Sequence, residues 1–168
     1  YNQASINKET TFYPDPAGPG FYGISHEGRL FHLHPKEGVT TLAGHVTRSN
    51  AVPYTPYDLT VTNEDREANQ WSIVGDFGND ARFSLGRHDL VVDPDHHQVI
   101  YVSDTNNHVI RKVDLTKGEA EITVFAGTIG ISSHVDGGRQ EALFKKPLGV
   151  EIVDGVLYVA DLGNNALR

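Results

Sequence analysis

The stretch YVSDTNNHVIRKVDL, from Tyr101 to Leu115, is followed 57 positions later by YVADLGNNALR, from Tyr158 to Arg168. A second matched pair lies upstream of these stretches, ARFSLGRHDLVVD from Ala81 and ALFKKPLGVEIVD from Ala142, with an offset of 61 positions. The two offsets differ because one copy has the longer turn DPDHHQ where the other has VDG. Turn lengths vary while packed strands keep their spacing, so the pattern predicts a repeated unit of strands.

Each complete unit reads as four short strands. Runs rich in Val, Ile and Tyr alternate with turns of Gly, Asn and Asp, which is typical of strands in an all-β fold. In the second unit the expected strands are DLVVD, VIYVSD, HVIRKVDL and ITVFAG, at residues 89–93, 99–104, 108–115 and 122–127. Only residues 137–146 are compatible with a helical turn. The sequence therefore predicts an all-β chain.

A looser copy, FYGISHEGRLFHLHPKEGVTTLAG at residues 21–44, comes before these two units. The interval between residue 44 and the next expected strand is about twice the corresponding interval further along the chain, which indicates an insertion at residues 45–80. Within it, YDLTVTNEDREANQWSIVGD predicts an extra hairpin that carries Trp71, the only tryptophan. An irregular loop with Trp71 packed beneath it is the alternative.

The repeated phrases, together with VDGGRQEALFKKPLGV at residues 135–150, resemble NHL repeats, the units of a family of β-propellers. The resemblance is specific over residues 99–127 and 135–168, looser over 20–44 and 75–93, and absent from 1–19 and from the insertion. It implies a β-propeller of four-stranded antiparallel blades of the NHL type, incomplete in this chain.

The resemblance also implies a division of the chain. Residues 1–19 are an N-terminal extension or the end of a preceding blade, 20–44 a partial first blade, 45–80 the insertion, 81–127 the second blade, and 128–168 an inter-blade loop and the first part of a third blade. Propellers contain ~4–8 blades, and each blade needs neighbours on both apolar faces. The expected partners are therefore the remaining blades of a longer parent chain, which the absence of Met favours, or other protein chains.

Short polar residues recur between the second and third expected strands. Asp104 precedes Asn106 and Asn107, and Asp161 precedes Asn164 and Asn165. Such side chains form hydrogen bonds with the backbone in tight turns. We expect these residues to build the turn first, and ligand binding is the second interpretation.

Composition narrows the range of partners. The 168 residues carry a formal net charge of −8, which argues against nucleic acid and anionic membrane surfaces as main partners. No stretch reaches the ~18 consecutive apolar residues of a membrane span, so no membrane insertion is expected. The chain has no cysteine, which leaves the compartment open, and a secreted or extracellular location is the favoured expectation.

Propellers usually bind ligands at one end of the ring, and the resemblance implies that His26, His45, His108 and His134 lie there. NHL-like propellers include the zinc-dependent lyase that completes peptide C-terminal amidation, so His26, His108 and His134 are candidate ligands for zinc or calcium. Nothing in their spacing forces them to converge, and exposed strand and turn histidines are the alternative. No cofactor is predicted.

The first functional interpretation is a non-enzymatic binding or structural module that contacts another protein or a glycan. Its candidate contact residues are Trp71, Tyr54, Tyr57, His108 and His134. For the aromatic residues the alternative, which the sequence slightly favours, is packing of the insertion onto its own blade. The second is a metal-dependent lyase or hydrolase with a site in the propeller channel. No catalytic residue is assigned, because the chain lacks cysteine and a Gly-x-Ser-x-Gly motif.

Overall fold

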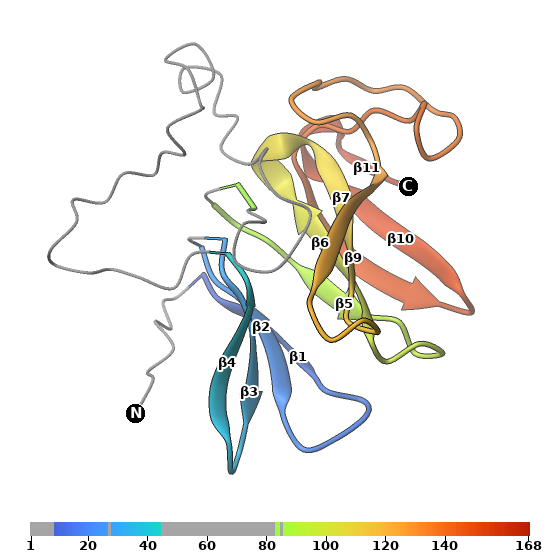
Figure 1. Cartoon of the computed structure of the whole chain (residues 1–168). Helices are drawn as coiled ribbons and strands as arrows, with labels where there is room; N and C mark the ends of the chain where they lie inside the picture. The colour runs from blue at the N-terminus through green and yellow to red at the C-terminus, as the bar shows by residue number, and fades with distance from the viewer. Residues whose placement is uncertain (1–8, 27, 45–82, 85) are drawn as a thin grey trace, which may run out of the picture.

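The computed structural model describes residues 9–26, 28–44, 83–84 and 86–168, which form three antiparallel sheets (Figure 1). The insertion predicted at residues 45–80, with its hairpin and Trp71, lies outside the described residues. Within the described ranges the only helical elements are short 3-10 turns. No helix in these ranges is long and apolar enough to cross a bilayer.

The first sheet has four strands in sequence order: β1 (Thr11–Pro14), β2 (Phe21–Ile24), β3 (Leu30–His34) and β4 (Gly38–Ala43). Strand β1 pairs with β2, with Thr11 opposite Ile24. This sheet therefore includes residues that precede Gly20, where the sequence-based division begins the first blade.

The second sheet contains β5 (Leu90–Val92), β6 (Val99–Asp104), β7 (Val109–Asp114) and β8 (Glu121–Ala126), again in sequence order. These bounds lie within one residue of the four strands expected from the sequence. The short 3-10 turn η2 (Thr105–Asn107) joins β6 to β7. Runs of Val, Ile and Tyr therefore predicted this sheet well, because β5 and β6 are mostly apolar on both sides and β7 and β8 combine apolar with polar residues.

The third sheet has the order β11-β10-β9, formed by β9 (Pro147–Val153), β10 (Val156–Asp161) and β11 (Ala166–Leu167). The 3-10 turn η3 (Leu162–Asn164) lies between β10 and β11, at the place that η2 takes in the second sheet. The Asp and Asn residues that repeat in the sequence therefore form these two turns.

Two apolar cores join the three sheets face to face. One packs Tyr22 and Ile24 of the first sheet against Leu90 and Val92 of the second. The other packs Val91 against side chains of the third sheet. Because successive side chains of a strand point to opposite faces, the three residues of β5 serve both cores, and the second sheet is covered on both sides.

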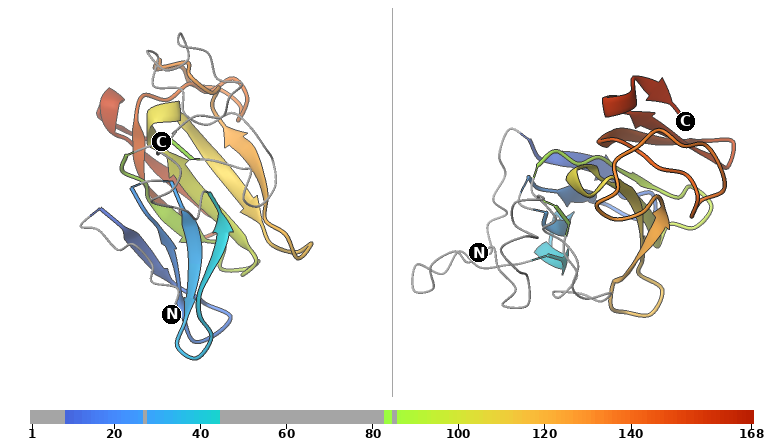
Figure 2. Two further views of the ribbon diagram at one scale, coloured as in Figure 1. Left: turned by 60° about the vertical axis from the view of Figure 1, so that its left-hand side comes forward. Right: turned by 90° about the horizontal axis from the view of Figure 1, so that it is seen from above.

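The sheets pack through their first strands, since β1 contacts β5 and β5 contacts β9. Figure 2 shows the same arrangement from two further directions, with the later strands of each sheet spreading away from these inner strands. The predicted fold class is confirmed: the chain is all-β, it is built from antiparallel propeller blades, and its sheets do not close into a ring. We call the three sheets the first, second and third blades.

Both end blades present uncovered apolar side chains. On the third blade Val156, Tyr158 and Leu167 are 52%, 40% and 72% exposed, and on the first blade Phe12 and Phe21 are also exposed. Both faces of the second blade pack against a neighbouring blade, and Val124 on its last strand β8 is 42% exposed.

Candidate binding site at the start of the inner strands

A buried carboxylate organises the turn that ends β6. The Asp104 side chain is fully buried, and its Oδ1 accepts a hydrogen bond from the Ser84 N–H at 2.8 Å. Its Oδ2 accepts one from Asn107 Nδ2 at 2.8 Å and a longer one from Arg111 at 3.5 Å. Asp104 therefore ties the turn to the segment that leads into the same blade.

The third blade repeats this arrangement. Asp161 accepts hydrogen bonds from the Lys145 N–H at 2.7 Å, from Asn164 Nδ2 at 2.8 Å and from Arg168 Nη1 at 3.4 Å. The expectation that these Asp and Asn residues build the turn is confirmed. The partners of Asn107 and Asn164 include the carboxylates, whereas the sequence suggested backbone groups.

His108 has a role in the same turn. It adopts the left-handed conformation with φ of 63°, as Asn165 does at the matching position with φ of 51°. Its Nδ1 accepts a hydrogen bond from the Lys146 N–H at 3.1 Å. Burial, with a smaller effect of the Lys146 charge, lowers the pKa of His108. A neutral imidazole that accepts this hydrogen bond therefore connects the second blade to the third.

The other candidate metal ligands lie apart. His26 Nδ1 lies 2.5 Å from the Glu9 carboxylate, while His134 is exposed in the loop before β9. Within the described ranges no three His, Cys, Asp or Glu side chains are close enough to hold a metal ion. The structure therefore does not bring His26, His108 and His134 together into one cluster. His45, Tyr54, Tyr57 and Trp71 lie outside the described residues.

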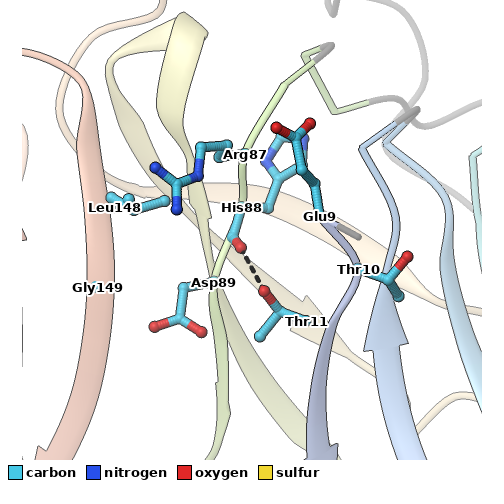
Figure 3. A pocket seen from close by; sticks show the side chains of 8 residues that line it. All are labelled: Glu9, Thr10, Thr11, Arg87, His88, Asp89, Leu148 and Gly149. Carbon is cyan, nitrogen blue, oxygen red and sulfur yellow. Dashed lines mark hydrogen bonds between the residues drawn. The ribbon is translucent and has the colours of Figure 1, made fainter. Parts of the chain in front are cut away.

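A cavity of about 350 Å³ opens where the three inner strands begin (Figure 3). It is at the same end of the blades as the β6–β7 and β10–β11 turns, because β5 and β9 run antiparallel to β6 and β10. Its lining comes from all three blades: Glu9, Thr10, Thr11, Arg87, His88, Asp89, Leu148 and Gly149. We call this space the axial cavity.

Several of these side chains hold the blades together. Thr11 donates a hydrogen bond to the His88 carbonyl at 2.8 Å, which joins the first blade to the second. Asp89 accepts hydrogen bonds from the Leu90 N–H at 3.0 Å and from the Val150 N–H at 3.1 Å, the second of which reaches the third blade. Burial raises the pKa of Asp89, against the lowering effect of these two hydrogen bonds.

His88 is fixed in place beneath the cavity. Its ring is buried, with Nδ1 2.9 Å from the Ser103 carbonyl oxygen and Nε2 2.7 Å from the Ser84 carbonyl oxygen. Both ring nitrogens are therefore occupied by the protein itself, and we assign His88 a structural role.

Arg87 differs from His88 in its contacts. Its side chain is exposed at the cavity, and across the described part of the chain its guanidinium has no hydrogen-bond or ion-pair partner. Figure 3 shows it beside Leu148 and above Asp89. The sequence analysis did not single out Arg87 or Asp89. Their position directly before the inner strand Leu90–Val92 is the signal that could have found them, because the starts of inner strands meet at the axis.

Comparisons with known proteins show the same fold. A structural genomics protein of unknown function from Bacteroides thetaiotaomicron VPI-5482 superimposes with a TM-score of 0.70 and 18% identity, over 98% of this chain and 36% of that one. An auxiliary nutrient binding protein from the same organism has a TM-score of 0.65 and 19% identity, over 95% and 36%. One from Bacteroides ovatus ATCC 8483 has a TM-score of 0.63 and 17% identity, over 94% and 36%.

The chain thus spans about a third of the length of these solved structures. At such identities the likeness establishes the fold alone. No family model matches the sequence, and no curated protein matches it.

Proposed function

We propose that this chain is a sector of an NHL-type β-propeller and acts as a non-enzymatic binding module that takes a saccharide at the axial cavity. The observation that carries the proposal is the convergence of Glu9, Thr10, Arg87 and Asp89 from two blades around one space. The volume of about 350 Å³ lies within the ~300–1,000 Å³ range of small-molecule sites. Hydroxyl, carboxylate and guanidinium groups match the many donors and acceptors of a sugar.

Two further observations support a binding role in an NHL-type propeller. A set of Asp, Asn and Arg around a buried carboxylate occurs in the second and third blades at the positions of the repeated phrase. Two of the solved structures that share the fold are auxiliary nutrient binding proteins. By analogy with these two structures, we infer a binding role for this chain.

The partners of the proposed propeller are the remaining blades or other protein chains. The apolar residues Phe12, Phe21, Val156, Tyr158 and Leu167 on the end blades are suited to pack against them. The sequence-based candidates for protein contacts remain Trp71, Tyr54 and Tyr57 of the insertion, together with His108 and His134.

Titration calorimetry with the purified chain tests the saccharide proposal. The probes are maltohexaose, cellohexaose, xylohexaose and trigalacturonic acid, and we expect binding of at least one. Glu9→Ala should weaken that binding, because it removes a lining group. Glu37→Ala is the matched control, since Glu37 is exposed in the turn at the far end of the first blade. Absence of binding to all four sugars by the folded chain would overturn the proposal.

A further inference from the structure

The charged side chains around the axial cavity differ in whether they already have a partner within the protein. The Glu9 carboxylate lies against His26, and both oxygens of Asp89 accept backbone hydrogen bonds. Arg87 alone among the charged lining residues has no partner in the part of the chain that the structure describes. Among the lining residues that the structure describes, Arg87 is therefore the free cationic group, beside two carboxylates that are already engaged.

The position of Arg87 is well defined. It is joined directly to His88, whose ring is held by two carbonyl oxygens, and the His88 carbonyl accepts a hydrogen bond from Thr11. These contacts fix the backbone that carries Arg87, while its exposed side chain can reorient toward a ligand. The planar set of guanidinium donors matches a carboxylate in two parallel hydrogen bonds.

We infer that the axial cavity recognises an acidic saccharide, a glycan with a uronic acid residue whose carboxylate binds Arg87. This inference rests on the proposed saccharide function and names the class of sugar. Glu9 and Asp89 line the same space and repel any anion, so a carboxylate alone fits poorly and the hydroxyl groups of a sugar are needed to offset this repulsion. A uronic acid carries hydroxyl donors for these acceptors and for Thr10, and its C–H face can contact Leu148.

The test compares trigalacturonic acid with its methyl ester, which keeps the sugar and removes the negative charge. By calorimetry we expect the acid to bind at least tenfold more tightly than the ester. Arg87→Gln should weaken binding of the acid about tenfold or more and weaken binding of the ester by a clearly smaller factor, because the ester loses only neutral hydrogen bonds. Arg87→Lys should have an intermediate effect, because it keeps the charge and loses the paired geometry.

Lys36→Gln is the control for charge, since Lys36 lies in the exposed β3–β4 turn and not at the cavity. Equal binding of acid and ester, or an equal loss of both in Arg87→Gln, would overturn the inference and leave the saccharide function standing. Binding of neutral hexaoses without trigalacturonic acid would do the same. Failure of every sugar to bind would instead overturn the proposed function.

Discussion

At the scale of single residues, His108 and Asn165 occupy equivalent backbone positions in two blades, with a different side chain in each. Both have positive φ at the end of a 3-10 turn. Asn is among the residues that tolerate this conformation best. The repeated phrase places His108 and Asn165 in register, so the third blade itself supplies a substitution that should preserve the turn of the second.

His108→Asn is expected to make stability less dependent on pH. Burial lowers the pKa of His108 in the folded state below its ordinary value of 6.5. As the pH falls below 6.5, the unfolded state therefore binds a proton before the folded state does, and stability is lost. Urea unfolding at pH 7.5, 6.5 and 5.5 should show a steeper fall for the wild type than for the variant. Parallel curves would contradict this account.

At the scale of elements, the carboxylates of Asp104 and Asp161 connect segments that lie apart in the sequence. Asp104 receives hydrogen bonds from the turn, from β7 and from the segment before β5. The matching bonds of Asp161 show that this connection belongs to the blade and not to one loop.

Asp104→Ala is expected to reduce the free energy of unfolding by about 3–5 kcal/mol, because it leaves Arg111 and two further buried donors without their acceptor. Asp114→Ala is the matched control in the same blade. Asp114 is partly exposed, and although hydrogen bonds from Thr116 lower its pKa to about 2, water screens its interactions. We expect a loss below about 1 kcal/mol there. Urea titration measures both, and equal losses would contradict a special role for Asp104.

The strands of the second and third blades could be predicted because their apolar residues alternate locally. Strand β1 was not predicted, since Thr11–Pro14 has no counterpart in the repeated phrases. The register of the third blade also differs by one residue from the sequence alignment. Tyr101 lies opposite Val91, and Tyr158 lies opposite Glu151, with a register shift between Val159 and Asp161. Pairing geometry sets such a shift, and it leaves little trace in the sequence.

At the scale of the whole molecule, equivalent residues differ because their blades have different neighbours. The Tyr101 ring packs edge-on against Phe125, with 4.7 Å between ring centroids, and belongs to the core shared with the third blade. Its counterpart Tyr158 is 40% exposed. The same residue type at the same blade position is thus covered in one blade and open in the other.

We expect Tyr101→Ala to cost about 2–4 kcal/mol of unfolding free energy in this chain and Tyr158→Ala less than about 1 kcal/mol. Denaturant titration of both variants measures the difference, and equal costs in a monomer would show that the third blade does not need a further neighbour. Sedimentation velocity, run in parallel, reports whether Tyr158→Asp weakens association with other chains.

The sequence by itself determined the all-β class, the repeated unit, most strand positions and the turn role of Asp104 and Asp161. Each of these depends on local alternation and turn chemistry, which neighbouring residues encode. Only the tertiary structure decided which loops meet. It placed Glu9 near Arg87 and Asp89 and kept His26, His108 and His134 apart. The reason is geometric, because the packing angle between blades sets the distances between their loops, and that angle arises from the two shared cores.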